Sequence, residues 1–208
     1  MLDVRIIRLI LELRESGINN SKVLSAIEKI PREFFIPENF RNQAYDNIAL
    51  PIGENQTISQ PFVVAKMTQL LNVKENHKIL EIGTGSGYQS AILSQLVRRV
   101  YTIERIKSLH LNAEKIFSKL NITNIVTKYA NGNLGWEEQI PFDRIIITAA
   151  TSKLSEKIIS HIIEGGIIVS PMIKANKQIL IKYTKLNNKI IEEEYDNVLF
   201  VPNLDNTQ

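Results

Sequence analysis

The stretch Lys78-Ile-Leu-Glu-Ile-Gly-Thr-Gly-Ser-Gly87 decides the fold of this chain. Its first five residues are mostly apolar and predict a short buried strand, and the three glycines that follow predict a tight turn into a helix. A glycine-rich turn at the carboxyl end of a first strand is where open α/β sheets bind their ligands. Three glycines can also be plain backbone geometry, so the surrounding pattern has to carry the interpretation.

On both sides of this turn, short apolar strands alternate with helices. Strands are predicted at 78–82, 99–104, 125–128, 143–148 and 166–170, and helices at 62–71, 88–96, 106–119 and 153–162. Such alternation predicts a doubly wound, mainly parallel α/β sheet. Two further strands, at 178–184 and 189–200, are predicted to form a C-terminal antiparallel hairpin that turns at Asn187-Asn188.

The segment before residue 61 differs from this alternating core. Apolar residues at helical spacing predict two N-terminal helices, at 3–15 and 20–29. Residues 32–60 then form a proline-containing loop rich in apolar and aromatic side chains, and long structured loops in compact domains are often functional. We therefore expect a single domain over 1–208 with three parts, which are 1–60, a ligand-binding core at 61–175, and C-terminal strands at 176–208.

The composition argues against several classes of protein. The 208 residues include no cysteine, which rules out disulfides, thiolate zinc sites and cysteine nucleophiles, and permits a reducing cytosol. The net charge of +3 is spread thinly, which argues against a nucleic-acid partner. Charged residues interrupt every apolar run near the N-terminus, so neither a signal peptide nor a membrane segment is predicted, and cytoplasmic residence is the expectation. The three histidines are scattered and predict no metal site.

Two nucleotide ligands compete for the glycine turn. Glu104 ends the second strand about twenty residues further on, where a carboxylate would bind a ribose hydroxyl pair. A dinucleotide fold requires a small residue at the last position of G-x-G-x-x-G/A, and Tyr88 stands there. The charge of Glu81 would repel a pyrophosphate but suits an amine and a sulfonium, and the ligand's carboxylate would lie on the helix amides after Gly87. The sequence therefore favours S-adenosylmethionine over a nicotinamide dinucleotide.

The sequence also argues against several classes of methyl acceptor. Methylation at pyrimidine C5 needs a cysteine nucleophile, and the chain has none. Amino methylation of bases typically uses an Asn/Asp-Pro-Pro-aromatic loop after the fourth strand, whereas this strand ends in Ile147-Thr-Ala-Ala150. Metal-assisted transfer to a catechol would need a cluster of carboxylates at the site, and no metal is expected.

Segments along nearly the whole chain resemble, in order, the signature segments of the protein-L-isoaspartate methyltransferases. They are Ile30-Pro-Arg-Glu-Phe-Phe-Ile-Pro37, Ala44-Tyr45, Leu50-Pro-Ile-Gly53, Gln56-Thr-Ile-Ser-Gln-Pro61, Glu81-Ile-Gly-Thr-Gly-Ser-Gly-Tyr-Gln89, Val100-Tyr-Thr-Ile-Glu-Arg105, Gly135-Trp136, Phe142-Asp143 through Thr148-Ala-Ala150, and Phe200-Val-Pro202. The resemblance implies the S-adenosylmethionine methyltransferase fold. It also implies methyl transfer to the free carboxylate of L-isoaspartyl residues in damaged proteins, which initiates repair, with isoaspartyl peptides and proteins as partners.

The resemblance assigns expected roles to particular residues. Ser59 would be catalytic and hold the acceptor carboxylate, on a substrate loop within 1–60. The cofactor-binding residues would be Thr57, Ile58, Glu81, Gly83, Gly85, Ser86, Gly87, Glu104, Asn131 and Gly132, with Glu104 at the ribose and Asn131-Gly132 at the adenine. Leu50, Val201 and Pro202 would line the peptide cleft. Considered without the resemblance, Thr57 and Ser59 are equally well explained as turn hydroxyls, and Tyr45 and Trp136 as core residues.

The chain also departs from the family pattern. Asn47 stands where the family usually has Asp, Ala49 where it has Pro, Asn55 where it has Gly, and Asn131 where it has Asp. Asn55 is a mild change because Asn tolerates positive φ, whereas Asn131→Asp is expected to restore a charge at the adenine and tighten cofactor binding. Two alternatives stay open, namely a cofactor-binding homologue with reduced or altered acceptor activity and a nicotinamide-dependent oxidoreductase.

The expected chemistry is an in-line displacement in which a carboxylate attacks a sulfonium methyl group. A carboxylate is already ionised at pH 7, so no general base is required. Catalysis would come from the alignment of oxygen, carbon and sulfur and from the exclusion of water.

Overall fold

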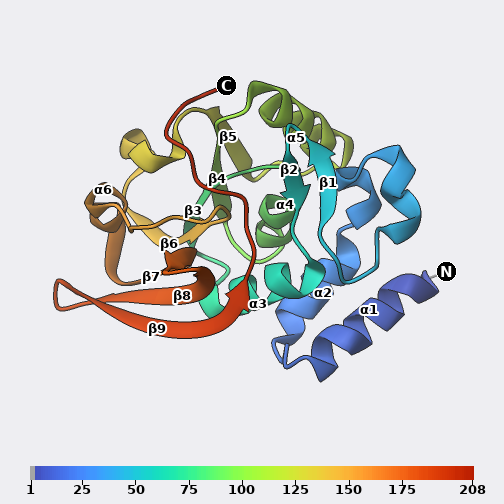
Figure 1. Ribbon diagram of the computed structural model, residues 1–208, viewed down its shortest axis with the longest axis horizontal. Coiled ribbons are helices and arrows are strands. Elements are labelled where there is room, and N and C mark those ends of the chain that lie inside the picture. Colours follow the sequence, from blue (N-terminus) through green and yellow to red (C-terminus); the bar gives the residue numbers. More distant parts are fainter. Residues whose placement is uncertain (1–2) are drawn as a thin grey trace.

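A seven-stranded sheet forms the centre of the computed structural model, which describes residues 3–208; Met1 and Leu2 lie outside the described residues. The strand order is β5-β4-β3-β6-β7-β8-β9 (Figure 1). The strands are β3 (Lys78–Ile82), β4 (Arg99–Glu104), β5 (Ile125–Tyr129), β6 (Phe142–Ile147), β7 (Ile162–Lys174), β8 (Lys177–Leu186) and β9 (Lys189–Val198). Strands β3 to β7 pair in parallel, and β8 and β9 extend the sheet antiparallel. The predicted fold class is confirmed.

The topology places the glycine turn at the switch point of the sheet. Strand β3 lies between β4 and β6. The chain therefore continues from β3 to β4 and β5 on one side, and later crosses to β6 on the other side of β3. Crevices at the carboxyl ends of strands, at such a point, are where open α/β sheets bind ligands. The turn begins at Gly83, immediately after β3.

Helices cover both faces of the sheet. They are α1 (Val4–Glu15), α2 (Ser21–Lys29), α3 (Pro61–Leu71), α4 (Tyr88–Ser94), α5 (Lys107–Lys119) and α6 (Glu156–Ser160). Successive side chains of a strand point to opposite faces, so Ile79 lies in the larger core with α1 to α5, and Leu80 lies in the smaller core with Ile158 of α6. Of the helices within residues 3–208, none has the length and apolar character needed to cross a membrane.

The loop region 32–60 is more ordered than the sequence predicts. It contains two 3-10 helices, η1 (Arg32–Phe35) and η2 (Glu38–Gln43), and a small hairpin of β1 (Leu50–Gly53) with β2 (Gln56–Ile58). The hairpin turn uses positive φ at Glu54 (52°) and Asn55 (54°), which confirms the expected conformation of Asn55. Strands of three and four residues carry too little alternation to be recognised in a sequence.

Two of the predicted core elements differ in length from those of the structure. Helix α6 has five residues instead of the predicted ten, and β7 has thirteen instead of five, because β7 begins at Ile162, opposite Phe142 of β6, and continues beside β8 to Lys174. The predicted C-terminal hairpin is confirmed. Asn187 and Asn188 both have positive φ, 51° and 59°, as a two-residue turn of type I′ requires.

The C-terminal tail after β9 crosses back over the carboxyl edge of the sheet. Its path is fixed by backbone hydrogen bonds from Ala150 N to Val201 O and from Asn203 N to Ala150 O, each 2.8 Å long. At the far end, Gln208 N donates to Arg105 O over 2.8 Å and Gln208 O accepts from Lys107 N over 2.9 Å. Figure 1 shows this red tail ending near β5. The tail thus lies beside the ends of β4, β5 and β6.

Candidate active site

A pocket that is partly open to solvent lies at the switch point of the sheet. The glycine turn, the end of β4, the β2 segment and the C-terminal tail all contribute to its walls. The lining residues among those predicted are Thr57, Ile58, Ser59, Gly83, Gly85, Ser86, Glu104, Gly132, Val201 and Pro202. The structure therefore gathers ten of the fourteen predicted site residues around one pocket.

The glycine turn is built from positions that exclude larger residues. Gly83 has φ of 99°, and a Cβ there would collide with Thr148 Oγ1. Gly85 also has positive φ, 53°. Gly87 has φ of 90°, but its Cβ would meet the Phe117 ring at 2.7 Å, so this glycine allows α4 to pack on α5. Gly87 does not line the pocket, and its cofactor contact stays a prediction.

Glu104 links the two walls of the pocket. Its Oε2 accepts from Gly85 N over 2.7 Å, and its Oε1 accepts from Ile106 N over 2.9 Å. The residue is 4% exposed and lines the pocket. Each carboxylate oxygen can accept more than one hydrogen bond, so the group is oriented by the backbone and retains capacity for a ligand hydroxyl.

Glu81 lies outside the pocket, contrary to the sequence prediction. It is completely buried, and its Oε2 accepts hydrogen bonds from the hydroxyls of Ser90 and Thr102. Burial raises the pKa of Glu81 to about 7, against the opposing effect of these two hydrogen bonds. The side chains of a strand alternate between faces, so Glu81 points into the packing between β3, β4 and α4 and does not present a charge to the ligand.

At the predicted adenine end, the structure separates Gly132 from Asn131. Gly132 lines the pocket, and a Cβ there would collide with Ile82 Cγ2. Asn131 does not line it. Its Oδ1 accepts from Asn133 N over 2.9 Å, and its Nδ2 donates to the backbone carbonyl of Asp205 in the C-terminal tail. Asn131 thus contacts the tail in this structure, and its adenine contact stays a prediction.

On the opposite wall, Thr57 and Ser59 line both this pocket and an adjoining one. The adjoining pocket is also lined by Ala49, Phe62, Val63, Asn197, Val198 and Leu199. Ser59 thus lies where the two pockets meet. Leu50, predicted to line a peptide cleft, is instead 3% exposed and packs in the core, where β1 pairs with β2.

Asn47 and Ala49, two of the departures from the family pattern, have separate surroundings. Asn47 Oδ1 accepts from Phe62 N at the start of α3 over 2.9 Å, and Asn47 Nδ2 donates to Glu12 Oε1 over 2.8 Å. A carboxylate at position 47 would repel Glu12, so Asn suits this chain. Ala49 lines the adjoining pocket.

The pocket carries no obvious general base. Its titratable lining residues are Glu104, Arg105 and Tyr88, and no lysine or histidine is among them. Within residues 3–208, no group of three His, Cys, Asp or Glu side chains could hold a metal ion. His77 and His161 are buried away from this pocket. Tyr45 and Trp136 are also buried, as expected for core residues.

Several lining residues escaped prediction from the sequence. Thr148 donates its hydroxyl to Gly83 O over 2.5 Å and to Ile82 O over 3.0 Å, and so closes the turn against β6. Its place at the end of the fourth core strand was a signal that could have been used. Asn203 and Phe200 come from the tail, whose return to the sheet has no signal in the local sequence.

The mainly parallel sheet, the glycine turn after β3 and the acidic residue that ends β4 form a nucleotide-binding site of the kind found in S-adenosylmethionine-dependent methyltransferases. Comparison with protein families narrows the class. The model of the protein-L-isoaspartate(D-aspartate) O-methyltransferase family matches residues 5–208, and the chain belongs to this family.

Similar proteins support the same grouping. The protein-L-isoaspartate O-methyltransferase of Maricaulis maris is 47% identical over 200 residues, covering 96% of this chain and 94% of that protein. That of Vibrio campbellii is 47% identical over 195 residues, covering 94% of this chain and 93% of the relative. Among solved structures, a Plasmodium falciparum protein described as the same enzyme, in complex with S-adenosyl-L-homocysteine, is 26% identical with a TM-score of 0.85 over 96% of this chain and 98% of that one.

Proposed function

We propose that this chain transfers a methyl group from S-adenosylmethionine to the free α-carboxylate of L-isoaspartyl residues in peptides and proteins. The observation that carries the proposal is the position of Ser59, at the junction between a pocket suited to the cofactor and a second pocket open to a peptide. The full-length match to the family supports it. The complex of the Plasmodium falciparum protein with S-adenosyl-L-homocysteine, the demethylated form of this cofactor, supports the choice of methyl donor.

The residues of the first pocket fit this cofactor. The narrow turn at Gly83 and Gly85 would hold its methionine part, with Ser86 and Thr57 beside it. Glu104, already oriented by two backbone amides, would accept hydrogen bonds from the ribose hydroxyls. Gly132, whose backbone lies directly against Ile82, would form with Ile82 the wall on which the flat adenine ring rests. When bound, the cofactor supplies a methyl group activated by a sulfonium.

The acceptor would enter from the second pocket. Ser59 would donate its hydroxyl to the α-carboxylate and align one oxygen for in-line attack, and Ile58 and Val201 would exclude water. A carboxylate is ionised at pH 7, so the absence of lysine and histidine from the lining fits this chemistry. The neighbouring backbone amide nitrogen would then attack the ester carbon, form a succinimide and release methanol with the amide proton, and hydrolysis of the succinimide would return some normal aspartate.

One assay tests the proposal directly. The protein is incubated with methyl-labelled cofactor and an isoaspartyl peptide, next to the same peptide with a normal aspartyl residue. We expect base-labile label in the isoaspartyl peptide and little in its aspartyl twin. Equal labelling of both peptides, or labelling of neither while the cofactor binds, would contradict the proposal and favour an altered acceptor.

A nicotinamide-dependent oxidoreductase is the second candidate, and the structure disfavours it. The position that needs a small residue in a dinucleotide turn holds Tyr88, a residue that is 2% exposed and whose ring packs against Phe35 at 5.5 Å between centroids. A titration of the protein into NADH, followed by the fluorescence of the dinucleotide, would detect such binding. We expect no change.

A further inference from the structure

Arg32 holds both ends of the loop that carries Ser59. The side chain is completely buried, 0% exposed, at the start of η1. Its Nη1 donates to Ala44 O over 2.8 Å and to Asp46 O over 3.4 Å. Its Nη2 donates to Ile48 O and to Ser59 O, each over 3.0 Å. One guanidinium therefore fixes the backbone at 44–48 to the backbone at residue 59.

The guanidinium of Arg32 makes no direct ion pair, although Asp46 lies near enough to raise its pKa against the larger, lowering effect of burial. In the described part of the chain, no carboxylate lies within ion-pair distance of its guanidinium. Burial lowers the pKa of Arg32 to about 10, so it remains a cation at neutral pH. Its Cζ lies 5.7 Å from the ring centroid of Tyr88, a lining residue of the pocket. A buried cation without a carboxylate partner is costly, which suggests that its charge serves an anion that arrives later.

We propose that Arg32 is a positioning residue for the methyl acceptor. It holds Ser59 in place through the Ser59 carbonyl, and its positive charge behind that residue favours a bound carboxylate. The inference rests on the proposed function, because it assumes an anionic acceptor at Ser59.

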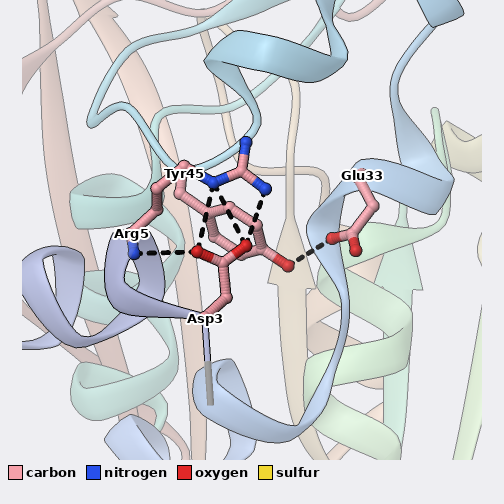
Figure 2. Close-up of polar contacts among 4 residues, drawn as sticks. All are labelled: Asp3, Arg5, Glu33 and Tyr45. Atoms are coloured by element: carbon pink, nitrogen blue, oxygen red, sulfur yellow. Dashed lines mark hydrogen bonds and ion pairs between the residues drawn. The ribbon is translucent and has the colours of Figure 1, made fainter. Parts of the chain in front are cut away.

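A separate set of contacts holds the outer side of the same loop (Figure 2). The Tyr45 hydroxyl donates to Glu33 Oε2, and Arg5 from α1 lies over the Tyr45 ring, with Cζ 5.2 Å from the centroid. Asp3 orients Arg5 through a 2.6 Å ion pair. The loop at 44–46 is thus held by Tyr45, Glu33 and Arg5 in addition to Arg32, so replacement of Arg32 should free the Ser59 end more than the 44–46 end.

Two variants at position 32 separate the shape of the side chain from its charge. Arg32→Lys keeps the charge but cannot reach four carbonyls with a planar fork. Arg32→Met removes the charge as well. Arg144→Lys is the matched control, because Arg144 is another buried arginine, 7% exposed, that donates to backbone carbonyls at Leu71, Asn72 and Asp143. Two of those carbonyls lie at the end of α3 and the third at the start of β6, away from Ser59.

Two measurements are made on each protein. Steady-state kinetics with an isoaspartyl peptide give kcat and KM, with cofactor affinity measured alongside by calorimetry. Hydrogen exchange of the segment 44–60 reports how firmly the loop is held, without any need for activity. For Arg32→Lys we expect kcat/KM for the peptide to fall about ten- to a hundredfold, mostly through KM, and faster exchange in the loop. For Arg32→Met the fall in kcat/KM should be larger. Both variants should bind cofactor with an affinity within about threefold of the wild type.

Several outcomes would overturn the inference. These are unchanged exchange at 44–60 in Arg32→Lys, unchanged peptide kinetics, or an equal loss in Arg144→Lys. Loss of cofactor binding in both Arg32 variants would make the residue a requirement of the fold alone and would equally overturn it. A wild-type protein that binds cofactor but does not methylate the peptide contradicts the proposed function instead, and in that case the exchange measurement still decides whether Arg32 holds the loop.

Discussion

At the scale of single residues, Ser59 is the side chain on which methyl transfer should depend most. The residue lies at the junction of the two pockets, while its backbone carbonyl is fixed by Arg32. Ser59→Ala leaves that backbone contact intact and removes only the hydroxyl. We expect cofactor affinity near that of the wild type and turnover of an isoaspartyl peptide reduced about 10- to 100-fold. Full turnover at saturating peptide would remove Ser59 from the reaction.

Glu104 should matter for the cofactor rather than for the acceptor. Its carboxylate accepts hydrogen bonds from the amides of Gly85 and Ile106, and the residue lines the pocket. Glu104→Ala should weaken cofactor binding by roughly 1.5–3 kcal/mol, the range for hydrogen bonds to a charged group. Glu104→Gln, which keeps one acceptor oxygen, should weaken cofactor binding less than Glu104→Ala does. Calorimetry that finds the alanine variant as tight as the wild type would place the ribose elsewhere.

At the scale of elements, the C-terminal tail changes the expectation for Asn131. Asn131 Nδ2 donates to the Asp205 carbonyl, and Asn133 Nδ2 donates to Asp205 Oδ1 over 2.5 Å. In Asn131→Asp, a carboxylate oxygen would face that carbonyl and loosen the tail. We therefore expect cofactor affinity to stay the same or weaken by about 1 kcal/mol, not to tighten as the sequence alone suggests.

A truncation provides the control for this prediction. In a chain that ends at Asn203, residues 204–208 are absent and position 131 has no tail to contact. There Asn131→Asp should tighten cofactor binding, because its charge becomes free to meet the adenine amino group. The test is a comparison of cofactor affinities, measured by calorimetry, for the wild type, Asn131→Asp, the truncated chain and the truncated chain with Asn131→Asp. Additive effects would show that the tail and position 131 are independent.

The elements themselves could be predicted where the local pattern determines them. Strand β3 matches its prediction residue for residue, and the Asn187-Asn188 turn follows from residues that tolerate positive φ. The β1–β2 hairpin and the extension of β7 were missed because they depend on pairing with other segments. The roles of Arg32 and Arg105 were missed for the same reason. The partner of Arg32 at Ser59 lies 27 residues away along the chain, and the partner of Arg105 at Asn206 lies 101 residues away. Glu81 was assigned to the pocket by motif, although strand alternation turns it inward.

At the scale of the whole molecule, buried Glu81 should make stability depend on pH. Burial raises its folded pKa to about 7, whereas an unfolded glutamate titrates near 4.3. The folded state therefore binds this proton more tightly, so its contribution to stability is full below pH ~4.3, declines as pH rises towards 7, and stays low above that.

Replacement of Glu81 by glutamine tests this directly. The full effect is on the order of 3 kcal/mol for a shift of this size in a fully buried group. Glu81→Gln should remove this dependence of the free energy of unfolding on pH. Denaturant unfolding from pH 5 to pH 8 should therefore show a smaller loss of stability, and so a smaller slope against pH, than in the wild type. The absolute stability is a poorer measure, because the new amide places a donor where Oε1 has no partner. Glu28→Gln, at an exposed position on α2, is the matched loss of one carboxylate and should keep the wild-type slope. An unchanged slope in Glu81→Gln would mean that Glu81 titrates normally within the folded protein.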